Sequence, residues 1–165
     1  MKNKNLISKP KIKLLKEKTF LKMILNSCGS LMWKNNYGLI DNKEIDLVQD
    51  GNLSCAFYVS SLLKLFDLIS DVHLTVKSTE KELLKNGFKK IPVSKNMPKG
   101  TVIIWKKKKE LNIYTNKKED HLHIGFYVGN EKAVSMSSFN GFPIIHHYLY
   151  NNTRKIAKAY YKKIV

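Results

Sequence analysis

Apolar residues recur at helical spacing in three stretches of the first half of the chain, over 12–25, 55–69 and 80–86. Two of these stretches carry residue types that are common at helix ends. Ser54 stands at the N-cap position of the second stretch, and Gly87 directly follows the third. The pattern therefore predicts three helices, of which the second has a broad apolar face suited to burial.

The second half of the chain changes to short β-branched and aromatic runs separated by turn residues. The run at 101–105 is mostly apolar, which is typical of a buried strand. The charged stretch 106–120 that follows it predicts a solvent-exposed excursion. Further strands are expected at 122–128, 133–138, 143–149 and 156–164, and a Gly-Asn-Glu-Lys turn joins the first two of these as a hairpin.

Helices that precede a run of antiparallel strands indicate an α+β fold, with the N-terminal helices packed on a small antiparallel β-sheet. The basic segment 1–11 contains a proline and is expected to be a loose arm. Residues 12–165 are expected to form one domain, because no linker or internal repeat interrupts them. Residues 31–53 are rich in Asn, Gly and Asp and are expected to wind without regular structure.

The formal net charge is +17, nearly all of it from lysine, since Arg154 is the only arginine. A basic surface attracts polyanions such as nucleic acid, acidic lipid or an anionic cell-wall polymer. Proteins that read nucleic-acid bases, however, favour arginine. Because the lysines are spread along the chain, a solvated surface and contact with an anionic polymer both stay open.

The lysines also affect whether the chain is predicted to carry a membrane span or a signal peptide. No stretch approaches the ~20 apolar residues that span a bilayer, so no membrane span is expected. Lys16, Lys18 and Lys22 interrupt any apolar core of a signal peptide. A cytoplasmic location is therefore slightly favoured over export, although the location itself is not determined.

Cys28 and Cys55 are the only cysteines, too few for a disulfide framework. Cys55 is predicted at a helix start, where N–H groups and the helix dipole favour a thiolate and lower the pKa of the thiol. The same N–H groups could bind an oxyanion. The competing interpretation is that Cys55 is a small buried apolar residue.

Two histidines alternate at the start of the strand predicted over 122–128, so His121 and His123 face the same side. An imidazole there could act as the base for a cysteine nucleophile. For His121 the expectation is plain exposure. A metal site that includes His146 and His147 is disfavoured, because no carboxylate or cysteine stands at a zinc-like spacing, and no cofactor is expected.

Three motifs resemble those of the NlpC/P60 cysteine peptidases and amidases, a papain-like superfamily related to the CHAP group. Ser-Cys-Ala-Phe-Tyr-Val-Ser at 54–60 is similar to their nucleophile motif, Asp-Cys-Ser-Gly-Phe-Val. Pro-Lys-Gly-Thr-Val-Ile-Ile-Trp at 98–105 is similar to their Pro-Gly-Asp-hydrophobic strand. His-Ile-Gly-Phe-Tyr-Val-Gly-Asn at 123–130 is similar to their histidine hairpin. The resemblance covers about 50–150, with the motifs in the family's order.

The resemblance implies a papain-like fold with Cys55 as the nucleophile at a helix N-terminus and His123 as the base. The third catalytic position, usually His in this family, falls on Ser135. A serine hydroxyl can accept a hydrogen bond from an imidazole N–H, but it supports an imidazolium less than a carboxylate would. Ser137 and Asn140 lie nearby and stay open as alternatives for orienting the base.

Two other positions depart from the family's pattern. Ser54 replaces the aspartate that precedes the nucleophile, and Tyr37 is too far from Cys55 in sequence to be assigned as the family's oxyanion tyrosine. The motif order is intact, and the changes at Ser54 and Ser135 motivate a non-catalytic alternative.

The resemblance implies a cysteine hydrolase that cleaves an amide bond, in a cell-wall peptide or a similar substrate, through a Cys-His dyad and an acyl-enzyme. Peptidoglycan is therefore a candidate substrate, and a monomer is expected. Two alternatives use the same scaffold. One is a non-catalytic binding module for an anionic polymer, and the other is an acyltransferase that forms the same thioester.

Overall fold

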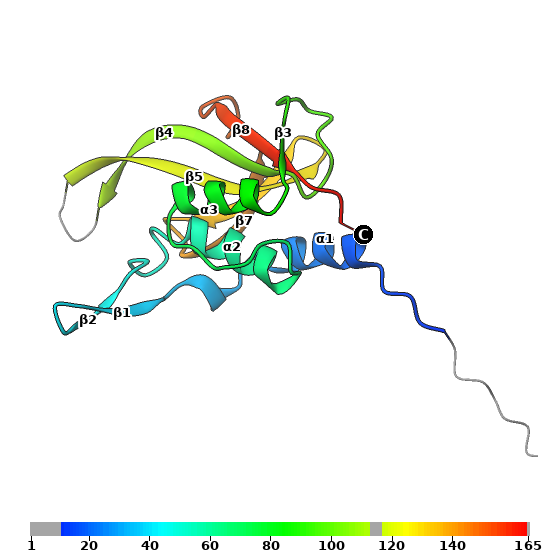
Figure 1. The fold of residues 1–165 in the computed structure, drawn as a ribbon. Helices are drawn as coiled ribbons and strands as arrows, with labels where there is room; N and C mark the ends of the chain where they lie inside the picture. The colour runs from blue at the N-terminus through cyan, green and yellow to red at the C-terminus, as the bar shows by residue number, and fades with distance from the viewer. Residues whose placement is uncertain (1–10, 113–116, 165) are drawn as a thin grey trace, which may run out of the picture.

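The computed structural model describes residues 11–112 and 117–164, and Figure 1 shows their arrangement. Within these residues, three α-helices are combined with a six-stranded antiparallel sheet. This arrangement confirms the predicted α+β class. The expected loose arm over 1–11 lies outside the described residues except for its last residue.

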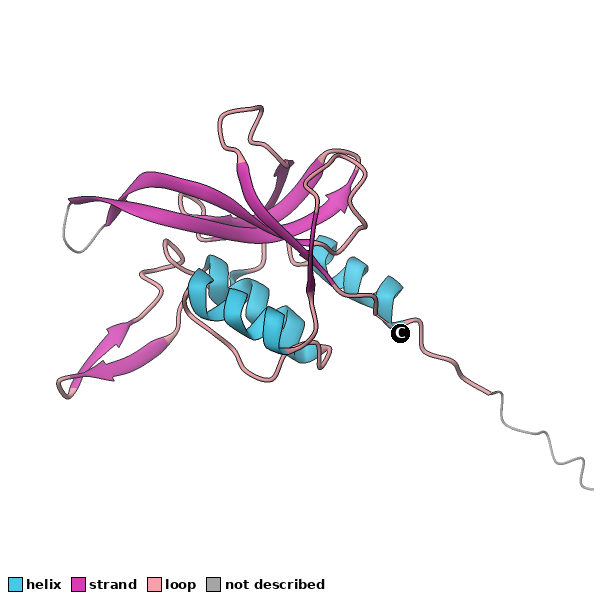
Figure 2. Cartoon of the chain, turned by 45° about the horizontal axis from the view of Figure 1, so that its top comes forward, coloured by secondary structure: helices cyan, strands magenta, loops and turns pink. Residues whose placement is uncertain are grey.

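The helices gather on one face of the sheet (Figure 2). They are α1 (Lys16–Asn26), α2 (Cys55–Leu65) and α3 (Val76–Lys85), together with a short 3-10 helix at Leu31–Trp33. Phe20 from α1 and Tyr58 from α2 both meet Phe126 of the sheet edge-on in the main core. Burial of each large apolar side chain contributes roughly 1.5–3 kcal/mol, so this layer fixes α2 against the sheet.

The sheet has the strand order β3-β8-β4-β5-β6-β7, and β4 and β5 occupy its middle. A second apolar cluster, which includes Trp105, Tyr127 and Tyr148, covers the face that the helices leave open. The strands are β3 (Lys89–Ile91), β4 (Val102–Asn112), β5 (Lys117–Gly129), β6 (Lys132–Ser137), β7 (Phe142–His147) and β8 (Ile156–Tyr161).

Helix starts differ from the sequence-based expectation because of capping. The third helix begins at Val76 instead of residue 80, since the Thr75 hydroxyl accepts a hydrogen bond from the Ser78 N–H at 3.1 Å. The predicted cap of α2 is wrong. The Ser54 hydroxyl donates to the Gly51 carbonyl at 2.9 Å and makes no cap hydrogen bond.

Two segments expected to lack regular structure contain paired strands. Part of the winding segment forms a hairpin of β1 (Tyr37–Ile40) and β2 (Lys43–Asp46). Residues 106–112 and 117–120 of the charged stretch extend β4 and β5 beyond the body of the sheet as a two-stranded arm, and the lysines at 106–109 are exposed. Residues 113–116 of this stretch lie outside the described residues. The hairpin and the arm project on the same side of the molecule (Figure 1).

The loop that leads into α2 is held against the turn between β6 and β7. Gly51 has a φ of +90°, and a Cβ added to it would lie 2.7 Å from Cα of Gly141 in that turn. Only glycine allows two backbones to approach so closely at this φ. The contact therefore sets where α2 starts relative to the sheet.

We expect Gly51→Ala to destabilise the protein by at least about 2 kcal/mol, because the new side chain adopts a disfavoured φ and meets the Gly141 backbone. Gly87→Ala is the matched control, since Gly87 has a φ of +82° and an added Cβ would meet no atom within 4 Å. The control incurs the conformational cost alone. Urea unfolding measures both losses, and equal losses would show that the Gly51–Gly141 contact does not hold the loop.

Candidate active site

Cys55 is the first residue of α2, and it is half-buried beside the sheet. The first N–H groups of a helix have no intrahelical partner, so they and the helix dipole place partial positive charge near this thiol. Cys55 and Cys28 are both thiols and form no disulfide. Burial raises the pKa of the Cys28 thiol, which makes Cys28 the less suitable nucleophile.

His123 lies on β5, directly opposite Trp105 of β4. The two rings are tilted by 36° with their centroids 5.2 Å apart. Trp105 is fully buried, and its indole N–H donates to the Tyr148 carbonyl at 2.7 Å. The imidazole of His123 is therefore supported by a ring whose own orientation is fixed.

Ser135 on β6 is fully buried, and its hydroxyl contacts the His123 ring. Its Oγ is 2.9 Å from Nε2 of His123. On its other side, the same oxygen is 2.8 Å from Nε2 of His146 and 3.1 Å from Oη of Tyr150. Gly125 leaves room for this cluster, because a Cβ there would lie 2.7 Å from Cβ of Ser135.

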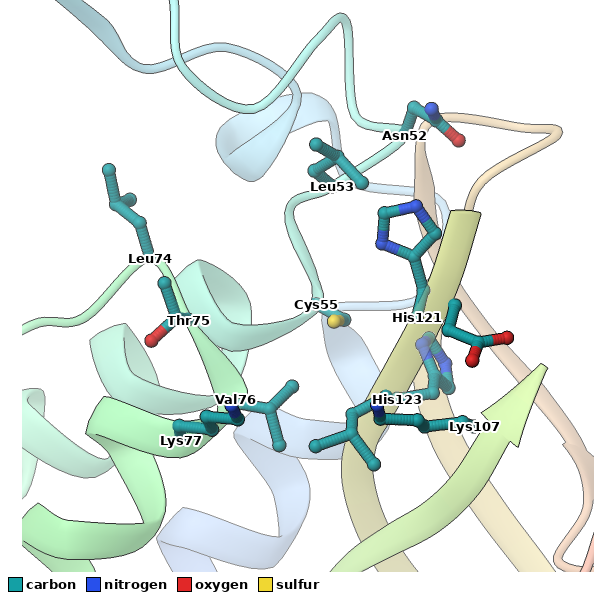
Figure 3. Close-up of a pocket in the computed structure, with 12 residues that line it drawn as sticks. Asn52, Leu53, Cys55, Leu74, Thr75, Val76, Lys77, Lys107, His121 and His123 are labelled. Carbon is teal, nitrogen blue, oxygen red and sulfur yellow. The ribbon is translucent and has the colours of Figure 1, made fainter. Parts of the chain in front are cut away.

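Two cavities have Cys55 and His123 in their walls. One, of about 320 Å³, lies between β5 and the start of α3, and Figure 3 shows Cys55 beside the strand from which His121 and His123 project. The other, of about 190 Å³, extends toward β6 and the loop after β7. Asn52, Cys55 and His123 line both cavities. A substrate spanning the two cavities would pass the thiol, which lines both.

The structure separates Ser135 from the other residues considered for its role. Ser137 and Asn140 bond to each other, with the Asn140 amide nitrogens at 3.1 and 3.2 Å from Ser137 Oγ. Tyr37 is 64% exposed at the start of β1 and lines neither cavity at the thiol. The expectation that His121 is exposed is wrong, since it is half-buried in the wall of the larger cavity.

Three residues of the site were not identified from the sequence. The three are His146, Tyr150 and Arg154. His146 on β7 stacks on Tyr150 at a centroid distance of 4.1 Å, whereas the sequence suggested for His146 only a disfavoured metal site. Arg154 is buried and donates to the carbonyls of Lys106 at 3.0 Å and His121 at 2.9 Å. Strand alternation could have placed His146 on one face of β7, but no sequence signal fixes the path of the loop that follows.

The site favours a neutral imidazole. Burial, aided by the charge of Arg154 and by His146, lowers the pKa of His123 from 6.5 to about 3. Burial also lowers the pKa of His146. Near neutral pH both rings are uncharged. The burial that keeps His123 neutral also opposes its protonation, so a proton taken from Cys55 would stay on the ring only with the thiolate as its counterion.

Metal ligands do not gather at this site. Among residues 11–112 and 117–164, no group of three or more His, Cys, Asp or Glu side chains could hold a metal ion. The same part of the chain contains no helix whose length and apolar character would let it cross a bilayer.

We expect stability to fall between about pH 6.5 and pH 4.5, because the unfolded chain binds a proton at His123 in this range and the folded protein does not. The loss attributable to His123 is about 2 kcal/mol. His123→Gln lacks this contribution and should lose less stability over the same range. Urea unfolding at both ends of the range measures the difference, and parallel losses in the two proteins would contradict the lowered pKa.

No protein-family model matches the chain, and comparison with curated proteins also gives no match.

Proposed function

We propose that this protein is a cysteine hydrolase that cleaves an amide bond, with Cys55 as the nucleophile and His123 as the base. One observation carries the proposal. The two side chains line the same two cavities, while Nε2 of His123 lies within hydrogen-bond distance of the Ser135 hydroxyl. A thiol, a neutral imidazole and a polar group that orients the imidazole are the parts that nucleophilic catalysis by cysteine requires.

In this proposal, His123 accepts the proton of Cys55 as the sulfur attacks the carbonyl carbon of the substrate. N–H groups in the first turn of α2 donate hydrogen bonds to the oxyanion. His123 then gives the proton to the leaving amine, and a thioester remains on Cys55. Water, deprotonated by His123, attacks the thioester; the carbon–sulfur bond breaks, the acid leaves, and His123 returns the proton to the Cys55 sulfur.

We also propose that the scaffold is the papain-like one of the NlpC/P60 peptidases. The support is topological. The helix that begins at Cys55 packs on an antiparallel sheet, and His123 and Ser135 lie on the neighbouring strands β5 and β6. A peptide such as those of peptidoglycan is the corresponding substrate, and this assignment comes from the motif resemblance alone.

Alkylation by iodoacetamide tests the dyad without knowledge of the substrate. We expect Cys55 to react faster than an ordinary exposed thiol near neutral pH, and we expect His123→Gln to slow it by roughly tenfold or more, because the thiol then lacks its base. Mass spectrometry of the modified peptides separates Cys55 from Cys28, whose pKa is raised by burial. Free glutathione alkylated under the same conditions gives the rate of an ordinary exposed thiol.

His121→Gln is the control for the choice of base, since it removes an imidazole from the same strand and the same cavity. The larger loss is expected for His123→Gln. If His121→Gln causes the larger loss, the base is assigned wrongly, and if neither variant slows an already ordinary thiol, there is no dyad.

A second candidate function is binding of an anionic polymer, and the position of the lysines favours it. Exposed lysines at 106–109 and 117–118 crowd the arm of β4 and β5. Lys107 lines the larger cavity and Lys108 the smaller one, so each of the two cavities that Cys55 lines has a lysine in its wall. This arrangement suits an acidic ligand whether or not the thiol reacts.

Lys107→Ala combined with Lys108→Ala should elute from a heparin column at lower salt than the wild type, because each of these lysines lies in the wall of a cavity that Cys55 lines. Lys81→Ala combined with Lys85→Ala removes the same charge from the exposed face of α3 and is the matched control. Equal shifts in the two double variants would mean that only the net charge matters, and would count against a binding site on the arm.

A further inference from the structure

We infer that His146 is a positioning residue, which acts through the Ser135 hydroxyl to fix the proton of His123 on Nε2 and leave Nδ1 as the basic nitrogen. The positioning role rests on the proposed function, because it concerns the base of that reaction. The hydrogen-bond geometry does not depend on it. The positioning role follows from counting donors and acceptors along the chain of hydrogen bonds that joins His123, Ser135 and His146.

The hydrogen-bond chain ends at a backbone carbonyl. Nδ1 of His146 lies 2.9 Å from the carbonyl oxygen of His147. A carbonyl oxygen only accepts hydrogen bonds, so this nitrogen must carry a proton. A neutral imidazole has one N–H, and Nε2 of His146 is therefore an acceptor.

The next step is the Ser135 hydroxyl, which has one hydrogen and two lone pairs. Nε2 of His146 lies 2.8 Å from the Ser135 oxygen and can only accept, so it takes the hydroxyl hydrogen. The other two contacts of this oxygen must then be donors. These are Nε2 of His123 at 2.9 Å and the hydroxyl of Tyr150 at 3.1 Å.

The last step concerns His123. Its Nε2 donates to Ser135, and the ring is neutral because of its burial. Its second nitrogen, Nδ1, is therefore unprotonated. That tautomer is the one that a base requires if Nδ1 is to accept the thiol proton.

Tyr150 supports the position of His146. Its ring stacks on the imidazole at 4.1 Å with an angle of 25°. Its backbone has a φ of +49°, and the next two residues are also at positive φ. Bulky residues seldom adopt this conformation, so the loop keeps Tyr150 in place at a conformational cost.

The first test needs no variant. Long-range ¹H–¹⁵N NMR on the full chain, labelled with ¹⁵N in histidine, reports which ring nitrogen carries the proton near pH 7. We expect His123 to be protonated on Nε2 and His146 on Nδ1. A His123 ring protonated on Nδ1, or one that averages between the two tautomers, would overturn the inference.

Two substitutions of His146 test its role directly. His146→Phe keeps a ring that can stack on Tyr150 but has no acceptor, so the Ser135 hydroxyl becomes free to donate to His123 and we expect His123 to shift toward the Nδ1-protonated form. Alkylation of Cys55 should slow by roughly 10- to 100-fold. His146→Gln offers an acceptor oxygen to Ser135 and should recover part of that loss.

The readouts separate this inference from the proposed function. If the tautomer shifts in His146→Phe but wild-type Cys55 reacts like an ordinary thiol, the positioning role holds and the hydrolase proposal fails. If Cys55 is activated and the His123 tautomer is the same in wild type and His146→Phe, the hydrolase proposal holds and the positioning role fails. If His146→Phe does not fold, the wild-type spectrum and His146→Gln decide the matter, since an Nδ1-protonated His123 in either protein contradicts the inference.

Discussion

The arrangement of this site depends on one hydrogen atom, that of the Ser135 hydroxyl. The hydroxyl is fully buried, so water does not compete for its bonds, and three polar groups converge on its oxygen. A buried polar group left without a partner costs roughly 1–3 kcal/mol, which gives the network one low-energy assignment of its protons. The packing around the Ser135 hydroxyl holds its three partners in position. Gly125 leaves space for Ser135, Trp105 supports His123, and the loop after β7 brings Tyr150 over His146.

Charge is distributed very unevenly around this network. The two imidazoles are held neutral in a buried interior, while exposed lysines on the arm surround the approach to the thiol. These features act on different parts of a reaction. A neutral base suits proton transfer inside the site, whereas surface lysines raise the local concentration of an acidic ligand before it binds. The hydrolase and the polymer-binding candidates therefore draw on different residues and need not exclude one another.

Much of the fold could be predicted because periodicity reports burial directly. The alternation around 122–128 and the apolar face of 55–69 led to β5 and α2, and with them to His123 and Cys55. The hairpin β1–β2 was missed, since its exposed strands carry no alternating pattern. The arm reads as an exposed excursion because its charged residues lack an apolar alternation. These residues nevertheless pair as strands, since the preceding parts of β4 and β5 already fix their register. The contacts of His146 and Tyr150 could not be predicted from the sequence for another reason. Their contacts depend on the register of β7 and on a loop of positive φ angles, neither of which single residues reveal.

The last acceptor in the proton network is the carbonyl oxygen of His147, a group that belongs to the backbone. Every amino acid at position 147 would present the same oxygen, so no substitution of that side chain removes it. The orientation of the network is therefore set by a backbone acceptor, which no side-chain substitution removes and which does not titrate in the ordinary pH range. His146 and Ser135 are the two side chains between this carbonyl and His123, so a substitution at either one removes a hydrogen bond of the network directly. The direction of the Ser135 hydroxyl is thereby less fragile than the small size of the group suggests, because it is set by the main chain.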